Sequence, residues 1–360
     1  MTNEDIDHVG FDFCLVACGC CFNQSSSTGD SPWVPSIHHC NRPLSECAHI
    51  DERFLEGRRR RILEENCNLT LLADSAATVL IVGAGFIGVE WACELKHTFP
   101  RLSVTLIDTL PRCLGPLPDS AAAYCQAFMD KSGIRTVYRL KYDPGHVEFW
   151  NKAGLQGGSQ LTYIMTGVKA SNYFMPRPTL STKGPGGGGW VLINQYLQVV
   201  SDSTRPDAQW GGGRVFAVGD CSVGYVESAA SRSSTATCLG LVPADSPFDL
   251  PPLPKTGFSA EAQALHACGN IKALSERLSS SYGGSQSLSK LLPARYPWGA
   301  GIFVISLGPS DGSTVLGCSE KKNTGRLAYS GLLAAAHKEL VQATKMAHLQ
   351  GRWHLASLIW

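Results

Sequence analysis

Long apolar runs, a dominant charge and most short catalytic signatures are missing from this sequence. No apolar run reaches ~18 residues, so no membrane-spanning helix is expected. The 31 basic and 30 acidic residues nearly balance, which gives no reason to expect a nucleic-acid partner. There is no Walker A or HExxH motif, so P-loop and zinc-protease chemistry find no support. The first residues, MTNEDIDHVG, show neither a signal-peptide nor a transit-peptide pattern.

Cysteine is plentiful, with 14 residues, but its spacing is not that of a metal site. Cys18 and Cys21 form a single CxxC, and no second pair follows at zinc spacing, so no metal is expected. A chain of 360 residues does not need a disulfide framework either. The pattern favours reduced, partly buried thiols in a cytosol-like compartment.

The stretch VLIVGAGFIGVEWACEL, residues 79–95, is typical of a buried strand, a glycine turn and a helix. Gly83, Gly85 and Gly88 match GxGxxG. They provide the tight turn, room for a pyrophosphate and close helix packing, in that order. The phosphates of a dinucleotide would then lie at the positive end of the helix. Asp108 ends the next predicted strand, where a carboxylate binds the adenosine ribose 2′-OH and repels a 2′-phosphate.

This fingerprint predicts NADH in preference to NADPH. Arg112 lies four residues beyond Asp108, and a bent loop would bring it to a 2′-phosphate, so NADPH stays open.

Strands alternate with helices along most of the chain, which predicts an α/β fold with a parallel, doubly wound sheet. A run of Pro and Gly at 184–189 is typical of an unconstrained loop. Strands are expected at 11–19, 78–82, 103–108, 136–142, 147–150, 161–167, 214–222 and 301–308, and a hairpin at 190–200. Helices are expected at 51–66, 86–97, 120–132, 258–274 and from about 331 to the end.

Three motifs in a fixed order point to a known family: FDFCLVACG at 11–19, VGAGFIGVEWACEL at 82–95 and VFAVGDCS at 215–222. A helical AEAQALHACGNIKAL follows at 260–274. With them the sequence resembles the two-dinucleotide-binding-domain flavoproteins of the pyridine nucleotide-disulphide oxidoreductase superfamily. The resemblance is closest to type II NADH:quinone oxidoreductases and apoptosis-inducing-factor-like NAD(P)H oxidoreductases.

The resemblance implies a Rossmann-like NADH domain inserted in an FAD-binding three-layer ββα domain, followed by a C-terminal helical segment. The implied boundaries are 1–75 for the first FAD-binding segment, 76–170 for the NAD(P)H domain, 171–290 for the second FAD-binding segment and 291–360 for the C-terminal segment. No GxGxxG precedes residue 83, so the FAD domain is expected to be incomplete and the chain N-terminally truncated.

The resemblance also assigns roles to individual residues. Glu90 would lie near the nicotinamide, and Thr166 and Gly167 would border NADH. Ala262 and Gln263 would start a helix whose positive end faces the flavin ring. The residues expected on FAD are Cys18, Gly19, Gly219, Asp220, Ala262 and Gln263. Those expected on NADH are Gly83, Gly85, Gly88, Asp108, Thr166 and Gly167, with Glu90 and Gln263 as the catalytic candidates.

The implied reaction is hydride transfer from NADH to FAD, followed by electron transfer to a quinone-like acceptor. Family members that reduce disulfides carry a redox cysteine pair, and the place of Cys18 and Cys21 argues against that branch. A second hypothesis stays open, in which the chain is a truncated, non-catalytic nucleotide-binding protein or fragment that lacks the FAD pyrophosphate site.

The C-terminal segment places Leu333, Ala336, Leu340, Ala343 and Ala347 on one helical face. One reading is a helix on a membrane surface, because the resemblance implies a lipid-dissolved quinone and allows the mitochondrial inner membrane. The other is a helix packed on the protein body, which the three alanines favour. The protein is thus expected to be soluble or peripherally membrane-bound.

Overall fold

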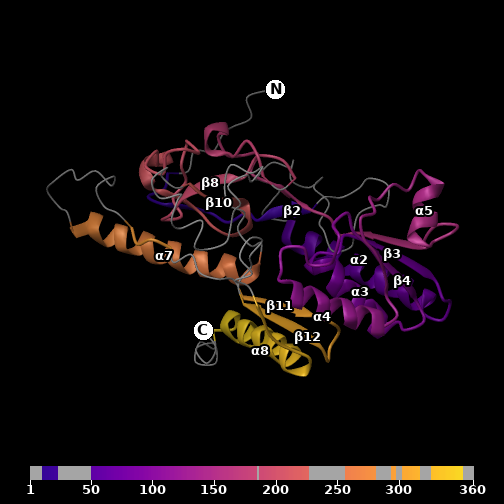
Figure 1. Ribbon diagram of the computed structural model, residues 1–360. Coiled ribbons are helices and arrows are strands. Elements are labelled where there is room, and N and C mark those ends of the chain that lie inside the picture. Colours follow the sequence, from indigo (N-terminus) through magenta and orange to yellow (C-terminus); the bar gives the residue numbers. More distant parts are fainter. Residues whose placement is uncertain are drawn as a thin grey trace. The chain divides into compact units, whose positions relative to one another are not determined.

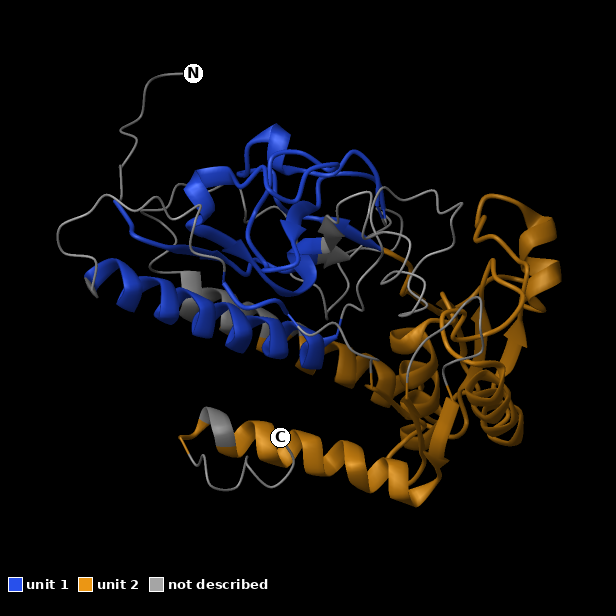
Figure 2. Cartoon of the chain, turned by 60° about the vertical axis from the view of Figure 1, so that its left-hand side comes forward, with its two compact units in different colours: residues 1–21, 168–299 blue, residues 22–167, 300–360 orange. Residues whose placement is uncertain are grey.

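The computed structural model of the protein describes residues 10–22, 50–184, 186–226, 256–280, 293–296, 302–316 and 326–351. The chain divides into two compact units (Figures 1 and 2). Unit 1 comprises residues 1–21 and 168–299, and unit 2 comprises residues 22–167 and 300–360. The finer sequence-based boundaries at 75, 170 and 290 stay predictions. The unit boundaries fall near 21, 167 and 299, so the C-terminal segment belongs to unit 2.

A four-stranded parallel sheet lies at the centre of unit 2, in the order β5-β4-β3-β6. Its strands are β3 (Thr78–Val82), β4 (Ser103–Ile107), β5 (Arg135–Val137) and β6 (Leu161–Ile164). Val82, the last residue of β3, pairs with Ile107 and Ile164, so the carboxyl ends of the three strands share one edge. The predicted α/β class with a parallel sheet is confirmed.

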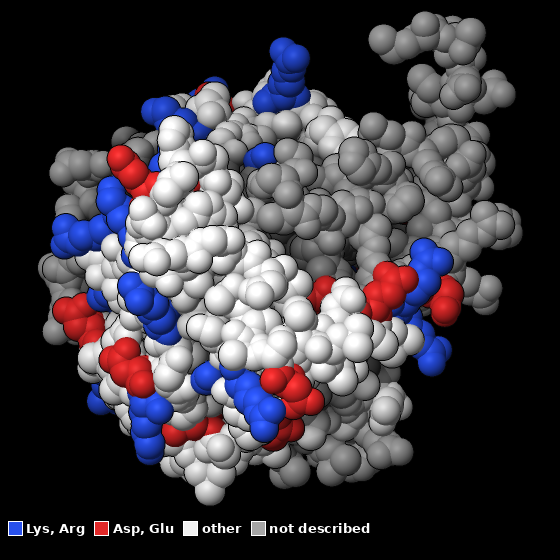
Figure 3. Space-filling view, turned by 90° about the vertical axis from the view of Figure 1, so that its right-hand side faces the viewer, with Lys and Arg blue, Asp and Glu red and all other residues white. Residues whose placement is uncertain are grey.

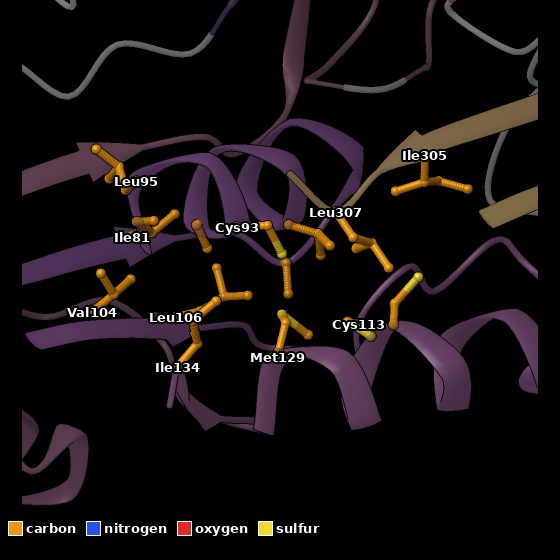
Figure 4. Close-up of a cluster of buried hydrophobic side chains, with 14 of the residues drawn as sticks. Ile81, Cys93, Leu95, Val104, Leu106, Cys113, Met129, Ile134, Ile305 and Leu307 are labelled. Carbon is orange, nitrogen blue, oxygen red and sulfur yellow. The ribbon is translucent and has the colours of Figure 1, made fainter. Parts of the chain in front are cut away.

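Helices α2 (Ile50–Leu72), α3 (Phe86–Thr98), α4 (Asp119–Lys131) and α5 (Val147–Ala153) accompany this sheet. The strands are apolar on both faces, as parallel strands covered by helices must be. Figure 4 shows Ile81 and Leu106 of the sheet beside Cys93 of α3 and Met129 of α4, all in one buried cluster.

One predicted strand is wrong, because residues 147–150 begin helix α5 instead. Phe149 and Ala153 are both buried, four residues apart, and Gly154 ends the helix in the left-handed conformation. The aromatic and β-branched residues of this short run imitate a strand in sequence. The strand expected at 136–142 is cut short at Val137, and Arg139 has a positive φ of 57°.

A second, antiparallel sheet completes unit 2: β11 (Ile302–Ser306), β12 (Gly312–Leu316) and β13 (Arg326–Ser330), in the order β11-β12-β13. Helix α8 (Leu332–Leu349) follows and packs on it. Phe303 stacks on Phe86 of α3 with ring centroids 5.5 Å apart. Ile305 and Leu307 belong to the buried cluster of Figure 4, so the C-terminal segment packs into the same hydrophobic core as the parallel sheet.

The described residues of unit 1 form three two-stranded sheets. Strand β1 (Cys14–Val16) pairs with β9 (Val215–Ala217), and β8 (Val191–Asn194) with β10 (Ser222–Val226), both in parallel. Strand β2 (Cys20–Phe22) pairs with β7 (Val168–Ala170). The described part of this unit also contains the 3₁₀ turns η2 (Arg177–Thr179), η3 (Trp210–Gly213) and η4 (Gly219–Cys221), and helix α7 (Gly257–Ser280).

The chain does turn back after β8 as predicted, with Asn194 N–H donating to the Gln198 carbonyl at 2.9 Å. The strand that pairs with β8 along its length is nevertheless β10, not the returning segment.

Acidic and basic side chains are interspersed on the face shown in Figure 3, in keeping with the net charge of +1. Within the described segments, no helix combines the length and the apolar character needed to cross a bilayer.

Candidate functional site

The glycine turn after β3 links the two central strands of unit 2. Gly83 N–H donates to the Ile107 carbonyl at 2.8 Å, which fixes the turn to the end of β4. Its φ is +108°, and a Cβ there would lie 2.7 Å from the Met165 carbonyl oxygen. Only glycine has both the backbone freedom and the small size that this position requires.

The other two glycines of the motif differ in what they require. A Cβ on Gly88 would lie 1.8 Å from the Gly83 carbonyl oxygen, so close packing of α3 on the turn explains this glycine. Gly85 has an ordinary φ of −76°, and a Cβ there would meet no atom within 4 Å. The protein's own backbone and packing therefore do not explain Gly85, which leaves open space beside the N-terminus of α3.

Asp108 lies directly beside this turn. Its Oδ2 accepts a hydrogen bond from Ala84 N–H at 2.6 Å, and its Oδ1 accepts one from Leu110 N–H at 2.7 Å. A carboxylate has about four acceptor sites, so capacity for a ligand hydroxyl remains. No side chain caps the N-terminus of α3, and its first turn holds no acidic residue. The turn thus combines a positive helix end with one fixed carboxylate.

Thr166 and Gly167 follow β6 on the other side of the turn. The Thr166 methyl group lies 3.0 Å from the place where a Gly83 Cβ would stand, and Gly167 has a φ of +68°. Unit 2 therefore brings together all six residues that the sequence predicts on NADH; their ligand contacts stay predictions.

Arg112 is fully engaged within its own loop. Its guanidinium donates to the carbonyls of Leu114, Gly115 and Leu117 at 2.7–3.1 Å and contacts Asp119 at 3.2 Å. It also reaches the carbonyl of the next residue, at 3.1 Å. This arginine stiffens its loop, and its donors are not directed at the 2′ position of a nucleotide.

Glu90 lies in the second turn of α3 and is bound from the C-terminal sheet and helix. Its Oε1 accepts from Ser306 N–H at 2.9 Å and from the Lys338 ammonium at 2.5 Å. Glu90 and Lys338 are 248 positions apart in the sequence, and no sequence pattern predicts their contact. The predicted place of Glu90 near the nicotinamide stays a prediction.

In unit 1, residues 218–221 (VGDC) follow β9 directly and form a turn that we call the corner. Gly219 has a φ of +71°, and its N–H donates to the buried Gln263 side-chain oxygen at 2.7 Å. Val218 N–H donates to the Val16 carbonyl at 3.0 Å, which continues the β1–β9 pairing up to the corner. Gln263 thus holds the corner in place, a positioning role that sequence reasoning did not foresee.

The start of helix α7 corrects one expectation. The helix begins at Gly257, not at Ala262, so Ala262 and Gln263 lie in its second turn. Thr256 provides the start signal, since its hydroxyl accepts a hydrogen bond from Ser259 N–H at 3.3 Å. The idea that these two residues form the helix N-terminus is therefore wrong, although α7 still packs on the corner.

Cys18 and Gly19, predicted along the flavin, lie beside the corner because Asn172 links them to it. The buried Asn172 amide donates to the carbonyls of Gly189 and Cys221 at 2.9 and 2.8 Å, and its oxygen accepts from the Cys18 thiol at 3.0 Å. Ser171 Oγ donates to the Gly19 carbonyl at 3.4 Å. Nothing in the sequence pattern singled out Asn172 or Ser171.

The Cys20 thiol lies 3.9 Å from an Asp220 carboxylate oxygen. Of the side chains that the structure describes, no group of three or more His, Cys, Asp or Glu is arranged to hold a metal ion. The side chain of Cys21, the other half of the predicted CxxC, lies outside the described part of the chain.

Solved structures share this fold. The ferredoxin reductase for the CYP199A2 system from Rhodopseudomonas palustris superposes with a TM-score of 0.50 at 15% identity, over 87% of this chain and 59% of that one. The NAD-dependent persulfide reductase from A. fulgidus superposes with a TM-score of 0.50 at 15% identity, over 88% and 46%. At 15% identity, these two structures show a shared α/β fold.

The sequence comparison names the family. Residues 7–236 match the pyridine nucleotide-disulphide oxidoreductase family, and the chain belongs to it. The family uses FAD and NAD(P)H, in agreement with the two cofactors predicted from the sequence.

Two curated relatives match over a short segment. The NADH dehydrogenase-like protein YutJ of Bacillus subtilis (strain 168) is 38% identical over 63 residues, which are 18% of this chain and 18% of that protein. Oxidoreductase OXR1 of Ajellomyces capsulatus is 36% identical over 61 residues, 16% of this chain and 13% of that protein. The matched segments therefore span less than a fifth of either relative.

Proposed function

We propose that this chain is an NADH-dependent flavoprotein oxidoreductase that passes electrons to a quinone-like acceptor. Membership of the pyridine nucleotide-disulphide oxidoreductase family supports the reaction class. The observation that carries the nucleotide assignment is Gly85, a glycine that no contact or dihedral angle of the chain requires, at the uncapped end of α3. The NADH dehydrogenase-like relative supports the choice of donor.

On the NADH side, the residues fit a dinucleotide. The open space at Gly85 lets a pyrophosphate approach the backbone N–H groups of α3, where the helix dipole stabilises negative charge. Asp108, which is held by two backbone N–H groups, would accept a hydrogen bond from the ribose 2′-hydroxyl. Because its charge repels a 2′-phosphate and Arg112 is engaged by its own loop, we propose NADH as the preferred donor.

On the flavin side, the residues present fit part of a site. A Cβ on Gly219 would lie 3.1 Å from the Ala260 Cβ, so any side chain would disturb the contact of the corner with α7. We propose that Asp220 binds the hydroxyl-bearing part of FAD, and that the backbone of Cys18 and Gly19 lies along it. When bound, FAD supplies the acceptor for the hydride of NADH.

Helix α8 is the element for which we propose contact with a membrane, the medium in which a quinone-like acceptor would be dissolved. Of the five residues on its predicted apolar face, Leu333 is 63% exposed and Leu340 51% exposed, and Ala336 and Ala343 are also exposed. Only Ala347 is buried. The opposite face packs inward through Ala334 and Ala335, among others. We propose that the exposed stripe touches a membrane surface, which a lipid-dissolved acceptor would require.

The nucleotide assignment is tested with two matched glycine variants. Gly85 and Gly269 both lack a positive φ, and a Cβ at either position would meet no atom within 4 Å, so the two form a matched pair for substitution by Val. Gly85→Val is expected to weaken NADH binding at least tenfold in calorimetric titration, because its side chain fills the space for the pyrophosphate. Gly269→Val, on α7, should bind NADH like the wild type. Equal affinity of all three proteins would overturn the assignment.

Flavin content separates the two hypotheses for the whole chain. A purified protein with bound flavin absorbance and NADH oxidation in the presence of a soluble quinone supports the oxidoreductase. A colourless protein that binds NADH but does not oxidise it supports the non-catalytic nucleotide-binding alternative.

A further inference from the structure

We propose, on the basis of the NADH site proposed above, that Arg112 is a positioning residue: it organises the loop after β4 so that this loop fixes the glycine turn for the phosphates of NADH. The sequence suggested only a direct contact of Arg112 with a 2′-phosphate. Its hydrogen bonds point to a role through the backbone instead, in which the guanidinium itself does not touch the nucleotide.

Every N–H group of the Arg112 guanidinium has its own acceptor. Nε lies 3.2 Å from an oxygen of Asp119. Nη1 and Nη2 each donate to two backbone carbonyls of the same loop, at 2.7–3.1 Å, and these belong to Cys113, Leu114, Gly115 and Leu117. A guanidinium carries five N–H donors in a fixed planar fork, so these five contacts saturate it. One side chain thus gathers four carbonyls of a segment, residues 109–118, that forms neither helix nor strand.

Leu114 connects this loop to the glycine turn. Its N–H donates to the Ala84 carbonyl at 2.8 Å, and its side chain is fully buried in the hydrophobic cluster of unit 2. Leu114 has a φ of +50°, a left-handed conformation that a residue other than glycine keeps only where its surroundings impose it. Nη1 of Arg112 binds the carbonyls of both peptide groups that flank Leu114, which imposes this conformation.

Two trans peptide groups pass the constraint on to Gly85. The carbonyl and the N–H of a trans peptide point in opposite directions, and the described chain has no cis peptide. Since Arg112 holds the Cys113 carbonyl, the Leu114 N–H points away from the guanidinium. The Leu114 N–H in turn holds the Ala84 carbonyl, so the Gly85 N–H points away from the loop.

The Gly85 N–H is the donor that this arrangement leaves for a ligand. Among the described residues no oxygen accepts a hydrogen bond from it, and a Cβ on Gly85 would meet no atom within 4 Å. The Ala84 N–H, in contrast, is bound to Asp108 Oδ2 at 2.6 Å. Because Ala84 is held at both its N–H and its carbonyl, the turn is ordered for an anion before one binds.

Lysine at position 112 separates positioning from simple charge attraction. An ammonium group keeps the positive charge, but its three donors radiate from one atom and cannot hold four carbonyls and a carboxylate around a planar fork. If Arg112 acted on the phosphates through its charge, Arg112→Lys would bind NADH as the wild type does. If it acts through the loop, the lysine does not replace it.

The test is calorimetric titration of the full chain and its variants with NADH. Arg112→Lys should bind about tenfold more weakly, the loss expected for one misdirected hydrogen bond to a charged group. The control Asp119→Asn removes only an acceptor that is 93% exposed, and it should bind like the wild type. Wild-type affinity in Arg112→Lys would overturn the positioning role. A wild-type protein that does not bind NADH would overturn the proposed function itself.

Two further measurements distinguish positioning from a general loss of stability. Arg112→Lys should weaken ADP as strongly as NADH and leave adenosine unchanged, because the effect falls on the donor for the phosphates; an equal loss for adenosine would refute this. Without any ligand, the Leu114 amide should exchange its hydrogen faster in Arg112→Lys, while the amides of β3 keep their wild-type rates. Unchanged exchange at Leu114 would contradict the constraint.

Tyr124→Phe is the control for stability. It removes the 2.8 Å hydrogen bond from the Tyr124 hydroxyl to Asp311, which lies in unit 2 but outside the loop and the glycine turn. This variant should melt at a lower temperature in circular dichroism and bind NADH like the wild type. If it lost NADH affinity as Arg112→Lys does, the effect of Arg112 would be one of stability alone.

Discussion

Gly85 and Gly88 belong to one motif, yet the structure predicts opposite effects when each is replaced by Ala. At Gly88 the new Cβ would lie 1.8 Å from the Gly83 carbonyl oxygen, a backbone atom that cannot turn aside. Helix α3 must then move away from β3 by more than about 1 Å, and the cluster of Figure 4 loses its close packing. At Gly85 the Cβ would meet nothing.

The expected magnitudes follow from these contacts. Gly88→Ala should destabilise unit 2 by about 3 kcal/mol, the upper part of the range for overpacked cores. In a domain of ~150–250 residues this lowers the melting temperature by about 6–12 °C. Gly85→Ala should change stability by less than about 1 kcal/mol, because a lower entropy of the unfolded chain offsets a poorer N-cap.

Thermal unfolding followed by circular dichroism, together with NADH titration, measures both effects. We expect Gly88→Ala to melt early, and Gly85→Ala to melt like the wild type but to bind NADH at least tenfold more weakly. If Gly88→Ala melted at the wild-type temperature, the packing argument would fail. If Gly85→Ala lost as much stability as Gly88→Ala, the open space at Gly85 would no longer indicate a ligand.

Three further outcomes are expected. Lys338→Met should lower the free energy of unfolding by about 1 kcal/mol, since the pair with Glu90 is partly exposed, and a double-mutant cycle with Glu90→Gln in urea checks the coupling. Alkylation of Cys18 by iodoacetamide should rise with pH around a midpoint near 7, because the hydrogen bond with the Cys221 thiol lowers its pKa to about 7. At pH 7 it should be about six times faster than an ordinary thiol after allowance for its lower nucleophilicity, and a midpoint near 9 would refute this. Replacing Leu333 and Leu340 by Ser should abolish co-flotation with anionic vesicles, and a wild-type protein that does not float would refute the membrane contact.

The local sequence was sufficient to predict the β3–α3–β4 part of unit 2. Strand β3 has the predicted bounds, and α3 and β4 agree to within one residue, because a buried strand, a glycine turn and an amphipathic helix each leave a short-range signal. The closeness of Asp108 to the turn was also predictable, since both follow neighbouring parallel strands.

Contacts between distant segments were not predictable in this way. The antiparallel sheet β11-β12-β13 and the Glu90–Lys338 pair depend on where the chain returns, and no periodicity records that. The glycine-rich tract at 184–189 is also more constrained than its composition indicates. A Cβ on Gly188 would lie 2.6 Å from two backbone oxygens, those of Ser181 and Thr182.

The pairing of β1 with β9 sets an order for folding during synthesis. Cys14 pairs with Val215, so about 200 residues must follow β1 before its partner exists. At ~5–20 residues per second this takes roughly 10–40 s. During this period the parallel sheet β5-β4-β3-β6 of unit 2 can form, whereas β1 has no strand partner. An unpaired strand edge held open for that time is a target for chaperones, and slow translation of residues 22–213 should prolong its exposure.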